Sequence, residues 1–405
     1  MTSRVEQVLA FFGRHRDGRL IKLVTGIRGC GKSYALDVWA ERLKLDGVSP
    51  EHILRYDLEN PRNRRLNESG ALLDSIEARM PKGDGRVYVL IDEICECNEF
   101  EAVIGVLHAR ERIDLTLTCS NKRPISDRFR EYLAGRCVYM EMLPPPFSEV
   151  PLPKGTGFEA RLIHVLRYGT LPYLDPFRGG KDIEGRGQVY LQGLWNTILV
   201  KDILTRNRLA DSRLTEKLIA RLYDHLGEGE SLRKIAADSA IDGREAAPNT
   251  VESYIDALDE SLLLRRVPKF DAFTGETLKA GYRFFLGDFG LGQCRYGEFP
   301  GDPMNAVRNL IALELAGRGG RVCCGRYDGS DFDFVTVRKD RFACWQLAPD
   351  IVGDAVPTPV LAPLKRIPND VQRTVIVRRE LPKRRAKGIE YVTLENFLMA
   401  RDRGK

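Results

Sequence analysis

A glycine-rich loop near the N-terminus carries residue types that bind phosphate. The segment Gly26–Ser33 reads GIRGCGKS, which fits the pattern G-x-x-x-x-G-K-[ST]. Its glycines let the backbone turn so that N–H groups face phosphate oxygens at the start of a helix. The pattern predicts that Lys32 binds the β- and γ-phosphates of ATP and that the Ser33 hydroxyl is a ligand of Mg²⁺. The predicted nucleotide-binding residues are Gly26, Ile27, Arg28, Gly29, Cys30, Gly31, Lys32, Ser33 and Tyr34.

An acidic pair follows a continuous apolar run, Val87–Ile91. Such a run is typical of a strand that is buried on both faces of a parallel sheet. Asp92 is predicted to complete the Mg²⁺ coordination, and Glu93 to polarise the attacking water as general base. Alone, an acidic pair after a strand is a weak signal. Combined with the upstream loop, it indicates that ATP is hydrolysed as well as bound.

A third β-rich run, Ile113–Thr118, ends in Cys119, Ser120 and Asn121. A polar side chain at this position can orient the attacking water or contact the γ-phosphate. The dipeptide Ser-Asn also favours the opening of a turn. The residues alone leave both interpretations open.

The elements around these residues indicate an α/β fold. Leu20–Val24 and Ile53–Glu59 have strand composition, and Ser33–Leu43 has helical periodicity. Strands that alternate with helices predict a parallel sheet with helices on both faces.

The composition indicates a chain of two or three domains without a membrane span. Its 405 residues exceed an ordinary single domain, and its 43% apolar content supplies sizeable cores. No apolar stretch reaches the length of a transmembrane helix, and the first residues lack the apolar segment of a signal peptide. We therefore expect a cytoplasmic protein.

The nine cysteines show no metal-binding spacing. Cys95-x-Cys97 and the adjacent Cys323 and Cys324 are too close together for a zinc site. Other cysteines lie in or beside apolar runs, where a reduced cysteine behaves as a small apolar side chain; these are Cys30, Cys119, Cys137 and Cys344. The sequence predicts reduced thiols.

The net charge of +6 is concentrated at the C-terminus. The segment 371–405 contains ten basic and four acidic residues. Its basic side chains either contact the phosphates of a nucleic acid or form a solvated loop; the densest group is Lys383, Arg384, Arg385 and Lys387.

The chain resembles bacterial and archaeal predicted ATPases of the AAA+ superfamily that join a P-loop module to a C-terminal nuclease-like domain of unassigned function. The resemblance covers nearly the whole chain. Its marks are the segments 25–33, 91–94, 118–121, 133–136, 144–149, 169–172 and 201–203. It implies that Asn121 is the sensor residue at the γ-phosphate and that the protein is a homo-oligomer. It also implies that Arg136 is an arginine finger for a neighbouring subunit's nucleotide, whereas its position after Gly135 equally suits a helix C-cap.

The resemblance implies four regions within an α/β fold. Residues 1–150 form a P-loop AAA+-type module with a parallel sheet, and residues 151–206 form a helical lid or linker. Residues 207–270 form a winged-helix-like segment, and residues 271–405 form an α/β domain like the PD-(D/E)XK nucleases.

The second helix of the winged-helix-like segment is acidic. It contains Glu252, Asp256, Asp259 and Glu260, and the first basic residues after it are Arg265 and Arg266. Because an acidic helix is repelled by the phosphates that line a DNA groove, we expect this helix to pack or to bind a protein partner. Any DNA contact of this segment is expected from Arg265 and Arg266.

The nuclease-like domain lacks part of the chemistry of a nuclease, which needs two carboxylates for metal and a lysine at the scissile phosphate. Asp333 and Glu314 are the candidate carboxylates. Arg308 stands where relatives carry a glutamate, and no lysine follows Gln346. We therefore predict that this domain does not cleave DNA.

Together these observations predict Mg²⁺-dependent ATP binding and hydrolysis, coupled to DNA binding or remodelling through the basic C-terminal segment. The alternative is a nucleotide-dependent signalling switch that controls the binding of a protein partner.

Overall fold

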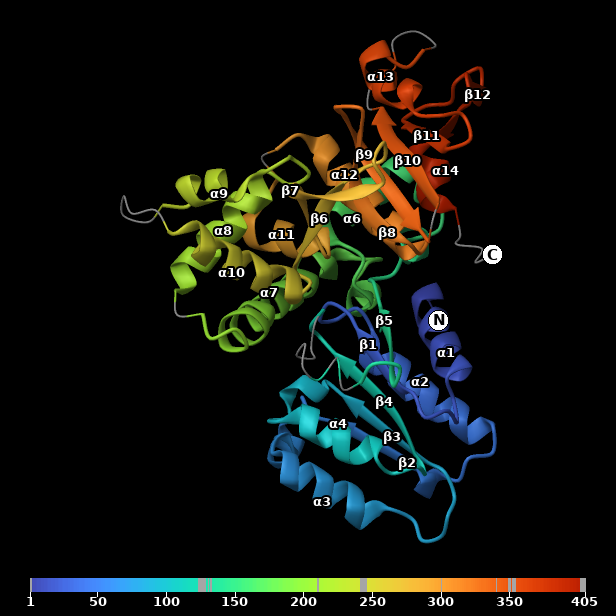
Figure 1. Cartoon of the computed structure of the whole chain (residues 1–405), viewed down its shortest axis with the longest axis vertical. Coiled ribbons are helices and arrows are strands. Elements are labelled where there is room, and N and C mark those ends of the chain that lie inside the picture. Colours follow the sequence, from blue (N-terminus) through green and yellow to red (C-terminus); the bar gives the residue numbers. More distant parts are fainter. Residues whose placement is uncertain are drawn as a thin grey trace. The chain divides into compact units, whose positions relative to one another are not determined.

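The computed structural model describes residues 2–122, 129, 131, 133–209, 211–240, 246–299, 301–339, 341–348, 351 and 355–400. The chain forms two compact units, drawn in Figure 1. The first unit contains Met1–Pro145 and Glu260–Leu262. The second unit contains Pro146–Asp259 and Leu263–Lys405.

The first unit is built on a five-stranded parallel sheet with the order β2-β3-β4-β1-β5. Its strands are β1 (Ile21–Thr25), β2 (Ile53–Asp57), β3 (Val87–Asp92), β4 (Ile113–Cys119) and β5 (Cys137–Glu141). Because β4 lies between β1 and β3, the carboxyl ends of these three strands meet at one edge. The pairing of Thr25 with Cys119 and of Ile91 with Leu117 sets this alignment. The predicted α/β fold with a parallel sheet is confirmed.

Helices cover both faces of this sheet (Figure 1). Helices α1 (Ser3–Arg14) and α2 (Lys32–Leu45) lie on one face, where the rings of Phe12 and Trp39 are 5.7 Å apart. Helices α3 (Ser69–Arg79) and α4 (Phe100–His108) lie on the other face. Every residue of β3 is buried, as expected for a strand covered on both sides. Short helices η1 (Pro50–His52), η2 (Pro61–Asn67) and η3 (Ile94–Glu96) complete the described elements.

A buried ion pair lies inside this sheet. Lys22 of β1 and Asp114 of β4 have fully buried side chains, and Lys22 Nζ is 2.6 Å from Asp114 Oδ1. The second carboxylate oxygen of Asp114 accepts a hydrogen bond from the backbone N–H of Asp17 at 3.0 Å. Burial lowers the pKa of Lys22 and raises the pKa of Asp114, and each charge partly offsets the effect on the other. Each charge therefore offsets part of the desolvation cost of the other.

We predict that Asp114→Asn destabilises the protein by about 3 kcal/mol or more, because it leaves the Lys22 ammonium buried without a counter-charge. The double variant Lys22→Met/Asp114→Asn should recover most of this loss, because no buried charge remains. The free energy of unfolding in urea measures both effects. An equal loss in the single and double variants would show that the unpaired charge is not the cause.

The second unit contains an eight-stranded mixed sheet with the order β12-β13-β11-β10-β9-β8-β6-β7. Strands β6 and β8, β10 and β11, and β11 and β13 pair in parallel, and the other neighbours are antiparallel. The strands are β6 (Leu264–Asp271), β7 (Glu276–Leu286), β8 (Arg321–Tyr327), β9 (Ser330–Arg338), β10 (Arg341–Ala348), β11 (Gln372–Val377), β12 (Arg385–Ala386) and β13 (Ile389–Thr393).

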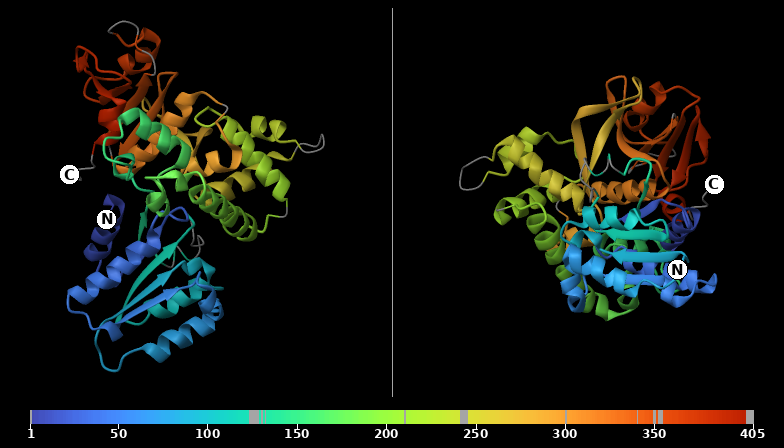
Figure 2. Two further views of the ribbon diagram at one scale, coloured as in Figure 1. Left: turned by 180° about the vertical axis from the view of Figure 1, so that it is seen from behind. Right: turned by 60° about the horizontal axis from the view of Figure 1, so that its bottom comes forward.

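Apolar side chains pack on both faces of the second sheet. Along β9, Phe334 joins the core formed with α12 and α14, whereas Val335 joins the core formed with α13. Figures 1 and 2 show that α7 to α11 lie on the side of this unit where β6 and β7 are. The helices of this unit are η4 (Phe147–Glu149), α6 (Phe158–Tyr168), η5 (Pro172–Phe177), η6 (Lys181–Ile183), α7 (Arg186–Thr197), η7 (Ile198–Thr205), α8 (Ser212–Asp224), α9 (Leu232–Asp238), α10 (Pro248–Glu260), α11 (Phe289–Tyr296), α12 (Pro303–Gly317), α13 (Thr358–Arg366) and α14 (Leu394–Met399). Within the described ranges, no helix is both long and apolar enough to cross a membrane.

The turn after α6 docks on the start of α11. The buried Asp288 carboxylate accepts hydrogen bonds from the backbone N–H of Thr170 at 2.7 Å and of Gly290 at 3.0 Å, so it also caps α11. Gly169 has a φ of 70°, and a Cβ there would lie 1.8 Å from Asp288 Oδ1. This close approach explains why glycine begins the Gly169–Pro172 turn.

Strand β6 crosses the domain boundary that the sequence predicts near residue 270. It pairs with β7 and β8, so the predicted winged-helix-like and nuclease-like regions contribute to one sheet. The predicted DNA-contacting Arg266 lies in this strand, where its guanidinium pairs with Asp256 of α10 and its backbone N–H donates to Asp259 at 2.9 Å. The acidic face of α10 therefore packs against β6.

Candidate active site

The glycine-rich loop joins β1 to α2 and brings the chain close to the segment after β5. Gly29 and Gly31 have φ values of 83° and 111°, which side-chain-bearing residues rarely adopt. A Cβ on Gly26 would lie 2.4 Å from the carbonyl oxygen of Met142. Because Gly31 has no side chain, the residue before α2 cannot cap the helix. The first N–H groups of α2 thus form a site that favours an anion.

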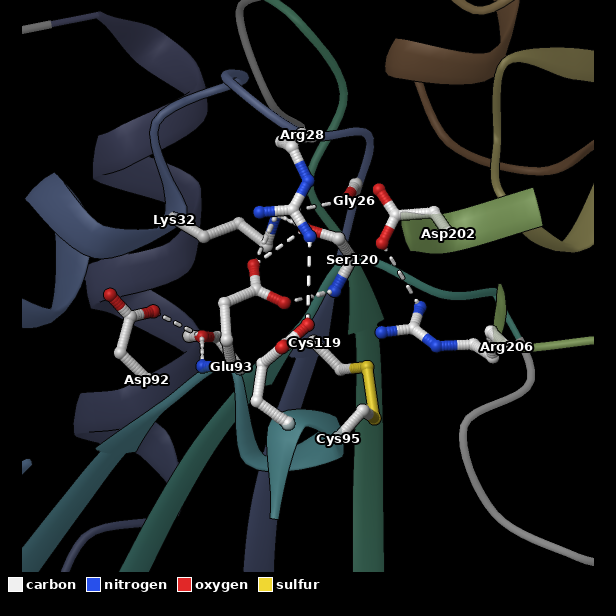
Figure 3. Close-up of a disulfide and its surroundings, with 12 residues drawn as sticks. Gly26, Arg28, Lys32, Asp92, Glu93, Cys95, Cys119, Ser120, Asp202 and Arg206 are labelled. Carbon is white, nitrogen blue, oxygen red and sulfur yellow. Dashed lines mark hydrogen bonds and ion pairs between the residues drawn. A yellow bond between two sulfur atoms is a disulfide. The ribbon is translucent and has the colours of Figure 1, made fainter. Parts of the chain in front are cut away.

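Lys32, the first residue of α2, extends toward the ends of β3 and β4 (Figure 3). Its Nζ donates to the carbonyl oxygen of Gly26 at 2.9 Å and to Ser120 Oγ at 2.8 Å. It also lies 3.2 Å from Glu93 Oε1. The residue is only 4% exposed, so its charge is compensated by these protein groups.

Glu93 directly follows β3, and its backbone turns sharply there, with φ 51° and ψ 53°. Its Oε2 accepts from the backbone N–H of Ser120 at 2.8 Å, and its Oε1 accepts from the Ser120 hydroxyl at 2.5 Å. The Glu93 backbone N–H donates to Thr118 Oγ1 at 3.0 Å. The carboxylate is thus fixed between the end of β4 and the start of α2.

Asp92, the last residue of β3, is held from two sides. The Thr118 hydroxyl donates to Asp92 Oδ1, and Arg55 Nη2 of β2 lies 3.1 Å from Asp92 Oδ2. Ser33 lies in the first turn of α2 with its side chain exposed. The Asp92 carboxylate and the Ser33 hydroxyl are hard oxygen donors of the kind that Mg²⁺ prefers.

The charges of this site stabilise each other. Burial alone would raise the pKa of Glu93, but the Lys32 and Arg28 charges and the Ser120 hydrogen bonds outweigh it and lower that pKa to about 2. Burial also works against the Lys32 ammonium, yet the Glu93 carboxylate more than compensates, so the pKa of Lys32 is raised. Both groups are therefore ionised at neutral pH.

Comparison with known families matches two segments of the chain. Residues 18–151 match the family model described as AAA domain, and residues 180–300 match a domain of unknown function (DUF8612). The matched segment 18–151, called the AAA module below, has the α/β fold with a parallel sheet that matches a P-loop AAA+ module. This AAA module contains the loop, Asp92 and Glu93.

Over most of its length, the chain is similar to proteins of low sequence identity. An uncharacterised protein of Haemophilus influenzae is 24% identical over 404 residues, which cover 98% of this chain and 97% of the relative. The AMPPCP-bound DnaA structure from Aquifex aeolicus is 14% identical with a TM-score of 0.29, covering 62% of this chain and 86% of that one. The ADP form of the Aeropyrum pernix ORC2 protein is 12% identical with a TM-score of 0.32, covering 78% and 93%. TM-scores this low carry no functional conclusion.

The predicted sensor Asn121 and the predicted arginine finger Arg136 lie at different places in the AAA module. Asn121 is buried one residue beyond Ser120, and its role as sensor stays a prediction. Arg136 is exposed just before β5, and its carbonyl oxygen accepts from the N–H of Ile21 at the start of β1. Because the loop follows the other end of β1, Arg136 lies at the opposite edge of the sheet. Its action as a finger requires a second subunit and stays a prediction.

The other predicted nucleotide-binding residues that carry side chains differ in how far they are buried. Ile27 and Cys30 point into the unit, whereas the Tyr34 side chain is 55% exposed. Arg28 is buried and pairs with Glu59, and its Nη2 lies 3.8 Å from Glu96 Oε1. The buried side chains support the loop, while Tyr34 is open to solvent.

The sequence named Ser120 and Thr118 only as parts of a polar strand end, and it did not single out Arg55. Ser120 connects Lys32 to Glu93, Thr118 connects Asp92 to Glu93, and Arg55 pairs with Asp92. The polar alternation of Thr118 and Ser120 at the end of an apolar strand is a usable signal, because such residues face one side. Arg55 has no comparable signal, since its role depends on β2 lying beside β3.

The prediction that all cysteines are reduced is wrong for two of them, because the structure joins Cys95 and Cys119 in a disulfide. Cys95 lies in η3 after β3, and Cys119 ends β4. These strands are neighbours, so their carboxyl ends bring the two Cα atoms to 6.0 Å. The remaining seven cysteines are free thiols.

In the second unit, the candidate nuclease carboxylates bind protein groups. Asp333 Oδ1 accepts from Arg308 Nε at 2.9 Å, and its Oδ2 accepts from the backbone N–H of Leu347 at 2.7 Å. Arg283 lies 3.6 Å from the same carboxylate. Glu314 is buried and accepts from the backbone N–H of Phe147 at 2.6 Å. Two guanidinium groups at Asp333 disfavour a metal cation there.

We predict that Asp333→Ala lowers the free energy of unfolding by about 3 kcal/mol, because two partly buried arginines and a buried backbone N–H lose their acceptor. The exposed Asp331, which pairs with Lys269, is the matched control, and Asp331→Ala should cost at most about 1 kcal/mol.

The wild-type protein should not nick plasmid DNA with Mg²⁺ or Mn²⁺, because the two guanidinium groups at Asp333 disfavour a metal cation there. Nicking that disappears in Asp333→Ala would contradict this account.

Proposed function

We propose that this chain is a Mg²⁺-dependent ATPase whose reaction takes place at the carboxyl edge of β1, β3 and β4. The observation that carries the proposal is the convergence of Lys32, Glu93 and Ser120 at that edge, beside the uncapped start of α2. The donor set fits the group it would hold: Ser33 and Asp92 would be the protein ligands of Mg²⁺. Bound Mg²⁺ would offset negative charge on the β- and γ-phosphate oxygens.

In the proposed reaction, the backbone N–H groups of the loop bind phosphate oxygens, and Lys32 binds the terminal phosphates. Without nucleotide, Lys32 is ion-paired with Glu93 and donates a hydrogen bond to Ser120, so phosphate oxygens would compete with these groups for the ammonium. A Glu93 carboxylate released from Lys32 would accept a proton from the attacking water. Beside Lys32 the low pKa keeps Glu93 ionised at neutral pH, and loss of the Lys32 charge would raise that pKa and make the carboxylate a stronger base.

Replacing Glu93 and Lys32 separates catalysis from binding. We expect Glu93→Gln to lower kcat by on the order of 10²- to 10⁴-fold, because the base is lost, while ATP still binds. Lys32→Ala should weaken ATP binding itself. A steady-state ATPase assay and the fluorescence of a labelled nucleotide measure the two effects.

The matched control is Lys44→Ala on the exposed side of α2, where Lys44 pairs with Glu41. It should leave turnover and binding unchanged. Undiminished hydrolysis by Glu93→Gln would remove Glu93 from the role of general base.

We further propose that ATP turnover is coupled to DNA binding through a basic hairpin, defined as residues 378–390 around β12. Its side chains Lys383, Arg384, Arg385 and Lys387 are exposed. Arg384 Nη2 lies 3.7 Å from Glu380 Oε1, and both side chains are exposed. A dense exposed group of cations suits a phosphate backbone without base specificity.

The coupling predicts that DNA stimulates ATP hydrolysis and that salt weakens DNA binding steeply. Replacing the four hairpin cations by alanine should lower the affinity and reduce the slope of log affinity against log salt by about 1 for each DNA phosphate that the protein no longer neutralises. Lys365→Ala/Arg366→Ala on the exposed side of α13 is the control. Fluorescence anisotropy of labelled DNA and the ATPase assay give both quantities. Equal turnover with and without DNA would favour the alternative, a nucleotide-dependent switch for a protein partner.

A further inference from the structure

The Cys95–Cys119 disulfide lies directly beside the residues that hold Glu93 (Figure 3). Cys95 is two residues after Glu93, and Cys119 is one residue before Ser120. The bridge therefore joins the two short segments whose hydrogen bonds fix the Glu93 carboxylate. All nine cysteines lie in described residues, and the other seven are free thiols.

Hydrogen bonds and the disulfide connect the same two segments. The Ser120 N–H and hydroxyl donate to the Glu93 carboxylate, and the Glu93 N–H donates to Thr118. The turn η3, which contains Cys95, also approaches the glycine-rich loop, since Glu96 Oε1 lies 3.8 Å from Arg28 Nη2. A covalent bond at this point opposes any separation of Glu93 from Ser120.

We propose that Cys95 and Cys119 form a thiol–disulfide site that controls the general base. In the disulfide form, Glu93 is held on Ser120 and Lys32. Reduction releases η3 from β4, so that Glu93 can leave Ser120 and reach the attacking water. The effect on turnover rests on the proposed ATPase function, whereas the effect on the mobility of Glu93 and Ser120 does not.

The reductant is a low-molecular-weight thiol of the glutathione class or a dithiol. Cys95 is partly exposed and Cys119 is fully buried, so a thiolate attacks the Cys95 sulfur. The sulfur–sulfur bond breaks, a mixed disulfide forms on Cys95, and Cys119 leaves as a thiolate that takes up a proton. A second thiol displaces Cys95, which yields two protein thiols and one oxidised disulfide of the reductant. Two electrons and two protons enter the protein, and oxidation by the corresponding disulfide reverses the reaction.

The neighbouring Cys97 does not take part in this exchange. It is buried, and burial, with Glu68 and Glu99 nearby, raises the pKa of its thiol to about 11. At neutral pH it is therefore a thiol, which is a poor nucleophile toward a disulfide. It provides a control cysteine next to the same turn.

The full-length protein is prepared in two forms, one treated with dithiothreitol and one with oxidised glutathione. Alkylation followed by peptide mass measurement gives the redox state of Cys95 and Cys119. We expect kcat for ATP to be at least about tenfold higher in the reduced form, a part of the roughly 10²- to 10⁴-fold that a positioned base contributes, with unchanged affinity for a fluorescent nucleotide. Cys95→Ser and Cys119→Ser should show the high rate in both conditions, and Cys97→Ser should respond as the wild type does.

Amide hydrogen exchange gives a second readout that is independent of turnover. Reduction should accelerate exchange at the Glu93 and Ser120 amides, which donate the hydrogen bonds between the two segments.

Equal kcat values and equal exchange in two forms with verified redox states would overturn the proposal and leave the ATPase function intact. Absence of turnover in both forms would refute the ATPase function, and the exchange data alone would then decide the redox proposal. A changed unfolding free energy with an unchanged kcat would show that the disulfide only stabilises the fold, and this too would overturn the proposal.

Discussion

The first unit depends on bringing the opposite charges of Lys32 and Glu93 together inside the protein. Each group is almost fully buried, and each alone would carry a large desolvation cost. At 3.2 Å they compensate each other, and Ser120 satisfies both with its hydroxyl. Burial, hydrogen bonding and charge therefore act together at one point, where the loop, β3 and β4 meet.

The strand order makes this meeting possible. Because β4 lies between β1 and β3 and all three are parallel, the loop after β1 and the residues after β3 and β4 emerge at one edge. A different buried pair, Lys22 and Asp114, joins β1 to β4 within the same sheet. The Lys22–Asp114 pair thus joins two strands inside the sheet, whereas the Lys32–Glu93 pair lies at its edge, where a phosphate ligand could separate the two groups.

The sequence was sufficient for the α/β class, because that class depends on local periodicity and strand burial. Local spacing also located the loop, Asp92 and Glu93, whose roles stay predictions. Ser120, Arg55 and the Cys95–Cys119 bond depend on which strands are neighbours, which local patterns do not encode. Likewise, Arg308 was recognised as foreign to a nuclease site, but its pairing with Asp333 required the sheet of the second unit. The extent of that sheet was also missed, since β6 resembles a separate wing until its pairing with β8 is known.

The central claim is that Lys32 exchanges Glu93 for nucleotide phosphate. A crystal structure with Mg²⁺ and a non-hydrolysable ATP analogue tests it most directly. The account predicts Lys32 Nζ on the terminal phosphate oxygens, Ser33 and Asp92 at the metal, and a longer distance between Lys32 and Glu93 than 3.2 Å. A nucleotide bound elsewhere, with Lys32 still paired to Glu93, would contradict it.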